Sequence, residues 1–388
     1  MMLSNLYFGP TARVAFGIDR IEKLAGDAAG LVGENAAILL ISDPGVTPLG
    51  DRAEAILKKG GHRVVRFQDI RSDPLSRQID AGAELARRHG ASLVVGLGGG
   101  STLDVSKMAA AIAPTSQPAE HYALAVNPLP DRPLRKICIP TTSGTGSETT
   151  KVSVFTNAKE EKVWAWGDAL SADLALLDPR LTVGLPAHLT AATGVDALVH
   201  AIEACTIRRA NPMNDGVCLQ AIRLIVSHLP RAVSAPDDLE ARAHVQIAAS
   251  LAGIAIDNSG TGVAHALGHA LGHVHHGRAV GLSLRTALAW NAEAAPARHA
   301  AVATAIGVAS EGRKQADILA ELSPRFDAFL RSTGLAVSLA KDGLDRKDSE
   351  RLAALMMAPE NKSMRESNCR PITPADALTL SQAVLSAA

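Results

Sequence analysis

About halfway along the chain, the spacing of apolar residues changes from mixed strand and helix patterns to helix patterns alone. Up to about residue 180, short apolar runs alternate with amphipathic stretches such as Gln78–His89. The runs are predicted to be buried strands: Ala36–Ser42, Arg63–Phe67, Ser92–Gly96 and Lys136–Pro140. Strands that alternate with helices pair in parallel through right-handed crossovers. The sequence therefore predicts an α/β domain with a parallel sheet, an architecture typical of nucleotide-binding domains.

The strand-like runs largely disappear after Asp178–Arg180 and Gly184–Pro186. The periodicity of the alanine-, leucine- and isoleucine-rich stretches that follow predicts long helices: Ala191–Cys205, Asp215–His228 and Leu239–Ile256. We therefore expect an α/β dinucleotide-binding domain at residues 1–183 and an all-helical domain at residues 184–388. A chain of 388 residues is long enough to form two such cores.

Charge and cysteine content limit the partners and the compartment. Lysine plus arginine equals aspartate plus glutamate, 39 each, and no basic run occurs, so nucleic acid is not an expected partner. The four cysteines lie far apart without a CxxC pair, which is typical of reduced thiols in a cytoplasm. Met1–Phe8 shows no secretory signal pattern, and no apolar run reaches the roughly twenty residues needed to cross a membrane.

A glycine-rich turn, Gly96–Ser101, lies between a predicted strand and a predicted helix, Thr102–Ala113. Glycines let the backbone approach a ligand closely, and the first N–H groups of a helix attract an anion. The pattern predicts a diphosphate cradle, although Ser101 replaces the third glycine of the GxGxxG fingerprint. A tight structural turn is the alternative.

A second polar loop, Thr141–Glu148, follows the predicted strand that ends at Pro140. Its hydroxyl groups and glycines are suited to a phosphate, ribose or amide; a plain surface loop is the alternative. Asp43 follows the strand Ala36–Ser42, where a carboxylate accepts hydrogen bonds from ribose and repels a 2′-phosphate. Asp43 therefore favours NAD over NADP, unless it only forms the turn before Pro44.

Asp196 and His200 stand four residues apart on a predicted helix. Residues at this spacing share one helix face, so their side chains could converge on one divalent ion. An aspartate beside a hydrogen-bonded core histidine would give the same pattern.

The segment Gly262–Gly277 concentrates five of the 13 histidines of the chain: His265, His269, His273, His275 and His276. We expect the first three of these to form a stripe along one helix face. Buried imidazoles without partners are costly, so their clustering among apolar residues favours a shared metal site over a solvated surface. Nitrogen and oxygen ligands suit Fe²⁺ or Zn²⁺.

With these elements in order, the chain resembles the iron-containing (group III) alcohol dehydrogenases over nearly its whole length. The most specific motifs are GGGSTLDVSK at Gly98–Lys107, PTTSGTGSE at Pro140–Glu148, TGVDALVHAIEA at Thr193–Ala204 and HALGHALG at His265–Gly272. The resemblance implies a dehydroquinate synthase-like fold and a metal-dependent enzyme that transfers a hydride between NAD(H) and a small alcohol or aldehyde. It also implies a homodimer.

The resemblance assigns roles to individual residues. Those that would hold NAD are Asp43, Asp73, Gly98, Gly99, Gly100, Ser101, Asp104, Thr141, Thr142, Thr145, Thr150 and Lys162. Gly99, Gly100 and Ser101 would lie on the diphosphate, and the threonines at 141, 142 and 145 nearer ribose and nicotinamide. The metal ligands would be Asp196, His200, His265 and a fourth histidine, with Fe²⁺ expected before Zn²⁺. His269 would lie beside nicotinamide and substrate, as a proton relay or positioning group.

Three positions depart from the family pattern. The histidine-glycine step comes sooner than usual and reads His275-His276-Gly277, so we expect His276 as the fourth ligand, with His275 or His273 as alternatives. Asp73 replaces an asparagine before Pro74. Cys369 replaces a proline after Asn368.

Other functions remain open at the level of sequence. A metal-independent maleylacetate reductase is disfavoured because that group tends to lack the aspartate found here at Asp196. A Zn²⁺-dependent glycerol dehydrogenase is a second alternative. A non-catalytic protein that binds NAD or metal is the alternative from another class.

Overall fold

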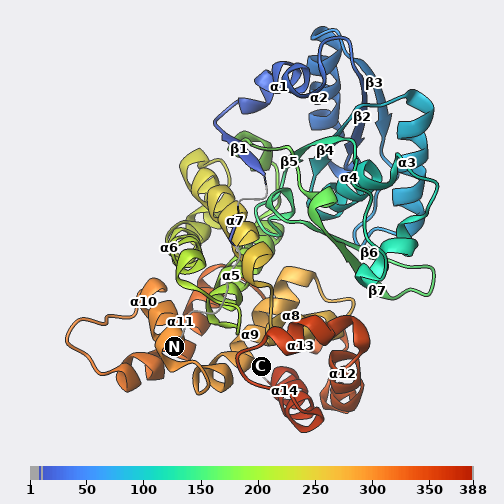
Figure 1. Cartoon of the computed structure of the whole chain (residues 1–388). Helices are drawn as coiled ribbons and strands as arrows, with labels where there is room; N and C mark the ends of the chain where they lie inside the picture. The colour runs from blue at the N-terminus through green and yellow to red at the C-terminus, as the bar shows by residue number, and fades with distance from the viewer. Residues whose placement is uncertain (1–7, 10–11, 387–388) are drawn as a thin grey trace. The chain divides into compact units, whose positions relative to one another are not determined.

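The computed structural model describes residues 8–9 and 12–386, and the chain divides at Gly184 into two units. The unit that ends at Gly184 contains the main sheet, and the unit that begins at Leu185 is helical (Figure 1). Gly9 belongs to the helical unit, where its N–H donates to Asn258 Oδ1 (3.0 Å) and its carbonyl accepts from Asn258 Nδ2 (3.2 Å). The predicted fold class, a parallel α/β region followed by an all-helical region, is confirmed.

The main sheet has six parallel strands in the order β1-β8-β5-β4-β2-β3. Their bounds are β1 Arg13–Phe16, β2 Ala37–Ser42, β3 Arg63–Phe67, β4 Leu93–Gly98, β5 Arg135–Pro140 and β8 Leu174–Leu177. A separate antiparallel hairpin consists of β6 Val152–Thr156 and β7 Lys162–Trp166. The four strands predicted from sequence correspond to β2, β3, β4 and β5. Strands β1 and β8 and the hairpin were not predicted from the sequence.

Helices cover both faces of the sheet because successive strand residues point to opposite sides. These helices are α1 Leu24–Val32, α2 Thr47–Lys59, α3 Ser76–His89 and α4 Gly100–Ile112. Ile38 and Leu40 of β2 pack in one core with α1 and α2. Leu39 and Ile41 pack in another core with α3 and α4. The carboxyl ends of the strands thus meet at one edge of a three-layer unit, which is where parallel sheets bind ligands.

The helical unit is built from α5 to α14. Their bounds are α5 Ala187–Thr206, α6 Pro212–Ser234, α7 Leu239–Ser259, α8 Val263–Ala270, α9 His276–Ala292, α10 Pro296–Ala305, α11 Gln315–Ser332, α12 Ser349–Met356, α13 Lys362–Ser367 and α14 Pro374–Ser386. One core joins α5, α6 and α7 to α9, α10 and α11. A second core joins α8 and α9 to the last three helices. Within the described part of the chain, no helix has the length and apolar character required of a membrane span.

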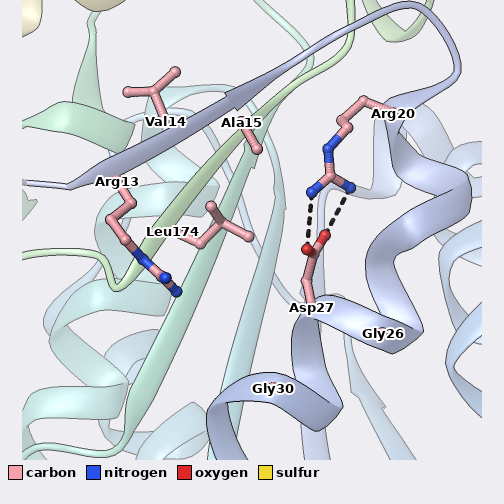
Figure 2. Close-up of a pocket in the computed structure, with 8 residues that line it drawn as sticks. All are labelled: Arg13, Val14, Ala15, Arg20, Gly26, Asp27, Gly30 and Leu174. Atoms are coloured by element: carbon pink, nitrogen blue, oxygen red, sulfur yellow. Dashed lines mark hydrogen bonds and ion pairs between the residues drawn. The ribbon is translucent and has the colours of Figure 1, made fainter.

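A hollow of about 390 Å³ lies beside β1 and α1 (Figure 2). Arg20 Nη1 and Nη2 donate to the two carboxylate oxygens of Asp27 at 2.7 and 2.8 Å. Gly26 and Gly30 of α1 line the same hollow without side chains to fill it. Because the arginine charge is already paired, and none of the residues assigned above lines the hollow, we assign no ligand to it.

Candidate functional site

Helix α5 supplies two of the expected metal ligands. Asp196 and His200 lie one turn apart and point to the same region, with His200 Nε2 3.8 Å from Asp196 Oδ1. Both are buried, and Asp196 is only 2% exposed. A buried carboxylate requires a compensating charge or hydrogen bonds, so this end of the site is suited to a cation.

Helix α8 supplies His265, which is also buried. Its Nε2 lies 3.9 Å from Asp196 Oδ1, and its ring stacks on His200 with 4.6 Å between centroids. The ligand atoms of Asp196, His200 and His265 all lie within 4.8 Å of one another. Three side chains from two helices, far apart in sequence, therefore converge.

Helix α9 begins at His276, whose Nε2 lies 3.6 Å from Asp196 Oδ1. The following residue, Gly277, packs directly on α5: a Cβ there would lie 2.0 Å from the carbonyl oxygen of Ala192. Only glycine permits this approach, so the histidine-glycine step brings the start of α9 against α5 and places His276 at the site.

The donor set fits a divalent ion. Asp196 Oδ1 and His265 Nε2 are buried and have no hydrogen-bond partner among the described residues. Asp196 Oδ1 lies 3.6–3.9 Å from the Nε2 atoms of His200, His265 and His276. A tetrahedral ion with bonds of about 2.0–2.2 Å separates its ligand atoms by roughly 3.3–3.6 Å, so only small side-chain movements would close the site around it.

The prediction that His273 belongs to the histidine stripe of one helix is wrong. Helix α8 ends at Ala270, and Gly272 adopts a left-handed conformation at φ 61°, so His273 lies beyond the helix. His273 is exposed, and its Nε2 contacts the carbonyl oxygen of Asp342 at 2.8 Å. His275 is also exposed. Of the three histidines considered for the fourth position, His276 is the one that the structure places against Asp196.

Two hydrogen-bond acceptors around these histidines were not identified from the sequence. Glu203 Oε2 lies 2.6 Å from His265 Nδ1, and Asn361 Oδ1 lies 3.1 Å from His269 Nδ1. The ring of His269 is 5.5 Å from that of His276, so it lies next to the cluster. Glu203 was detectable in principle, because a carboxylate three residues after His200 shares its helix face.

The residues predicted to bind the cofactor gather at the carboxyl edge of the sheet. Strand β4 ends at Gly98 and α4 begins at Gly100, with no side-chain hydrogen bond capping the helix. A Cβ on Gly98 would lie 2.9 Å from Asp43 Cβ, and one on Gly100 would lie 2.6 Å from Thr145 Cγ2. Gly99 faces Thr142. The turn is thus packed against both other parts of the predicted site.

Asp43 takes part in its own turn as well. Its Oδ1 accepts from the Gly45 N–H at 2.7 Å, and its Oδ2 accepts from Thr102 Oγ1 at 3.5 Å. Asp43 Oδ1 therefore stabilises the turn before Pro44, as the alternative interpretation predicted. The second oxygen, to which the described residues supply one long hydrogen bond, remains suited to a ribose hydroxyl.

Asp104 and Thr150 hold the second loop in place. Asp104 accepts from Ser147 Oγ at 2.6 Å and from the Val154 N–H at 3.0 Å. The hydroxyl of Thr150 is buried and accepts from Lys107 Nζ at 3.1 Å. The structure thus places both side chains within the protein framework around the loop. Lys107, fully buried, was not singled out from the sequence.

Asp73 and Lys162 are brought together from distant segments, with 2.8 Å between Asp73 Oδ1 and Lys162 Nζ. Asp73 has a positive φ of 51°, and the carbonyl of the following Pro74 accepts from the Thr156 N–H of the hairpin. The pair therefore ties the hairpin β6–β7 to the loop after β3.

Two family matches cover most of the chain. Residues 10–179 match the family described as iron-containing alcohol dehydrogenase. Residues 190–385 match the C-terminal part of the Fe-containing alcohol dehydrogenase family.

Individual relatives agree. Long-chain-alcohol dehydrogenase 1 of Geobacillus thermodenitrificans is 33% identical over 359 residues, which cover 91% of this chain and 90% of the relative. The crystal structure of a 1,3-propanediol oxidoreductase superposes with a TM-score of 0.90 at 28% identity, covering 98% of this chain and all of the other. The sulfoacetaldehyde reductase of Bifidobacterium kashiwanohense, solved in complex with NAD⁺, superposes with a TM-score of 0.88 at 28% identity and covers 99% of both chains.

The motifs, the convergence of the expected ligands and these matches all agree. The chain therefore belongs to the iron-containing alcohol dehydrogenase family, whose enzymes carry out NAD-dependent oxidoreduction with iron or another divalent metal.

Proposed function

We propose that Asp196, His200, His265 and His276 hold the divalent ion with which this enzyme interconverts small alcohols and aldehydes. The observation that carries the assignment is the buried Asp196 Oδ1, which lies 3.6–3.9 Å from three imidazole Nε2 atoms and has no hydrogen-bond partner among described residues. Fe²⁺ is the expected ion, and Zn²⁺ suits the same donors.

When bound, such an ion supplies Lewis-acid chemistry that lowers the pKa of an alcohol hydroxyl. The protein contributes a site that is largely shielded from water, since Asp196, His200 and His265 are all buried. Charge interactions are stronger in such an environment than in water. His276 is partly exposed, and substrate would reach the cluster from its side.

NAD⁺ supplies the hydride acceptor. Gly99, Gly100 and Ser101 would bind its diphosphate through the uncapped N-terminus of α4, where N–H groups and the helix dipole favour an anion. Thr141, Thr142 and Thr145 would lie nearer ribose and nicotinamide. Asp43 would exclude a 2′-phosphate and so select NAD over NADP.

The remaining predicted cofactor residues fall into two groups. Asp104 and Thr150 would act through the second loop, because their side chains are bonded to Ser147, Val154 and Lys107. Asp73 and Lys162 would contact NAD from the hairpin side. Gly98 would contribute by having no side chain, which leaves room for Asp43 beside the turn.

His269 would hold or pass on the proton that leaves the alcohol hydroxyl. Its Nδ1 faces Asn361 Oδ1, and the amide nitrogen of Asn361 donates to the Leu355 carbonyl at 3.0 Å. That second bond orients the amide with its oxygen toward His269. The ring of His269 is thereby held in a fixed orientation next to His276.

The test combines metal analysis of the purified protein with NADH absorbance across small alcohols, diols, hydroxy acids and aldehydes. We expect about one Fe²⁺ or Zn²⁺ per chain and turnover with NAD(H) that chelation abolishes. NAD(H) binding without turnover on any substrate would favour a non-catalytic binding protein. Turnover that survives complete metal removal would favour a reductase of the metal-independent type.

We also propose that the enzyme acts as a cytoplasmic homodimer. All four cysteines are free thiols, as expected in a reducing compartment. Strand β1 lies at the edge of the sheet and exposes Val14, Phe16 and the nearby Ile18 at 46%, 44% and 53%. An edge strand with exposed apolar side chains is a natural surface for pairing with a second copy.

A further inference from the structure

Glu203 contacts the expected metal ligand His265 without being an expected ligand itself. It follows His200 by three residues on α5 and is only 1% exposed. Its carboxylate receives three contacts: from the Gly262 N–H at 2.9 Å, the Ala264 N–H at 2.7 Å and His265 Nδ1 at 2.6 Å. A buried carboxylate with this many donors is well satisfied without a metal ion.

The contact with His265 determines which ring nitrogen carries the proton. Glu203 already accepts from two backbone N–H groups, one on each carboxylate oxygen. With Glu203 acting as an acceptor on both oxygens, the proton in the contact of 2.6 Å is assigned to His265 Nδ1. In a neutral imidazole, Nε2 then carries a lone pair. That atom is buried, has no hydrogen-bond partner among described residues and lies 3.9 Å from Asp196 Oδ1.

Glu203 also fixes the backbone from which His265 projects. Helix α8 begins at Val263, and the N–H groups on either side of that residue both donate to Glu203. The Val263 N–H donates to Asn368 Oδ1 at 3.3 Å. Asn368 is therefore a second anchor of the same helix start, but one for which no contact with the His265 ring is described. This difference provides a matched control.

We propose that Glu203 is a positioning residue of the metal centre, which holds His265 in the Nδ1–H form with its Nε2 lone pair directed at Asp196. The proposal rests on the proposed function, in which His265 is a metal ligand. Ligating histidines commonly donate their second nitrogen to a carboxylate, and loss of that partner typically weakens metal binding 10- to 100-fold. The alternative is that Glu203 only caps the start of α8.

The test is Glu203→Gln, which keeps the shape of the side chain but replaces one acceptor oxygen with an NH₂ donor. If the new NH₂ group faces His265 Nδ1, it donates to that nitrogen, and the His265 proton shifts to Nε2. If the NH₂ group faces the Ala264 N–H instead, the start of α8 loses that hydrogen bond. We expect ¹⁵N NMR of metal-free protein with labelled histidine to show His265 as Nδ1–H in the wild type and as Nε2–H in a measurable fraction of Glu203→Gln. Zn²⁺ affinity, measured by competition with a chromophoric chelator, should fall 10- to 100-fold.

Glu203→Asp and Asn368→Ala complete the experiment. Glu203→Asp keeps an acceptor-only carboxylate, so it should retain the Nδ1–H form and recover part of the affinity, and it replaces the glutamine variant if that fails to fold. Asn368→Ala loosens the start of α8 but should leave His265 as Nδ1–H. Equal affinity losses in Glu203→Gln and Asn368→Ala, with His265 unchanged as Nδ1–H in both, would show that Glu203 is only a cap and overturn the proposal.

His265→Ala separates this proposal from the proposed function. If His265→Ala binds Zn²⁺ as tightly as the wild type, the ligand assignment fails, and the role of Glu203 toward the metal fails with it. If His265→Ala loses Zn²⁺ while Glu203→Gln keeps both wild-type affinity and the Nδ1–H form, the ligand assignment stands and only the role of Glu203 is overturned.

Discussion

At the scale of single residues, two buried histidines of the helical unit, His265 and His299, have different kinds of partner. His265 lies with its Nε2 at Asp196 and its Nδ1 at a carboxylate, as a cation site requires. His299, on α10, is also buried, and among the described residues the hydrogen-bond partner of its Nδ1 is the backbone carbonyl of Ala295 at 2.9 Å. The same residue type therefore belongs to the proposed metal centre in one place and to the packed core in another, and the partners of each ring distinguish the two.

The proposed ligands can be tested against a neighbouring histidine. Asp196→Ala and His276→Ala should lose the bound metal and reduce turnover by more than about a hundredfold, since ligand loss should cost at least as much as loss of a supporting partner. His273→Ala should keep both, because His273 faces Asp342. Metal content and NADH-linked turnover of the three variants decide the matter. If His273→Ala loses the metal and His276→Ala retains it, the fourth ligand is misassigned.

His299 gives a prediction about pH. Burial lowers the pKa of His299 below its ordinary value of 6.5, so the folded protein binds this proton less well than the unfolded chain. The stability from a neutral His299 is therefore complete above pH 6.5 and is lost as the pH falls through the lower folded-state pKa. The slope cannot exceed about 1.4 kcal/mol per pH unit for one proton.

Urea unfolding of the metal-free protein between pH 5 and 8 measures this effect. His299→Gln should show a shallower loss of unfolding free energy on acidification than the wild type. The exposed His188 provides the control, and His188→Gln should follow the wild-type curve. Parallel curves for His299→Gln and wild type would contradict the assignment.

At the scale of elements, the sequence was informative where an apolar pattern was long or continuous. Strand β2 is buried throughout and β5 is buried except for its first residue. Their apolar runs fit a buried strand better than a helix or a loop. Strand β1 is mostly exposed and only four residues long, so its pattern is no stronger than that of a loop. Strand β8, with the sequence LALL, suits a helix equally well. The local sequence pattern does not determine the secondary structure of such short segments. In the folded protein, pairing with neighbouring strands determines it.

The same limit applies to the candidate site. The spacing of Asp196 and His200 on one helix could be derived from sequence, because it depends only on helix geometry. The sequence did not show that α8 ends before Gly272. Because the helix ends there, His273 does not lie on its face. Nor could the contact between Glu203 and His265, which are far apart in sequence, be derived without the fold.

Lys107 links two elements and yields a prediction at this scale. From α4, its Nζ donates to the carbonyls of Ser147 and Val152 and to the hydroxyl and carbonyl of Thr150. Lys107→Met would leave these buried groups, and the carboxylate of Asp104 at 3.5 Å, without their cation. We expect a loss of about 3–5 kcal/mol of stability, together with weaker NADH binding because the second loop is released.

Urea unfolding and NADH fluorescence titration measure the two effects of Lys107→Met. Lys159→Met removes an exposed lysine from the turn between β6 and β7, and should change neither. A loss of stability with unaltered NADH affinity would show that the loop is not part of the cofactor site.

At the scale of the whole molecule, the sheet of the α/β unit ends differently at its two sides. Strand β3, at one side, carries the exposed, charged Arg63. Charged side chains on an edge strand discourage pairing between chains. Strand β1, at the other side, has Val14 and Phe16 two residues apart, so both project from the same face. An edge of this kind favours association, and the proposed homodimer uses it.

The dimer is tested by placing charge on that edge. Two copies related by a twofold axis bring the same residues together, so Val14→Lys with Phe16→Lys sets like charges against each other in the interface. Sedimentation velocity should show the wild type at twice the chain mass of 40.3 kDa and the double variant at the single mass. Met213 on α6 is similarly exposed, at 55%, and Met213→Lys should remain dimeric. A double variant that stays dimeric would move the interface away from β1, and a monomeric wild type would remove the dimer altogether.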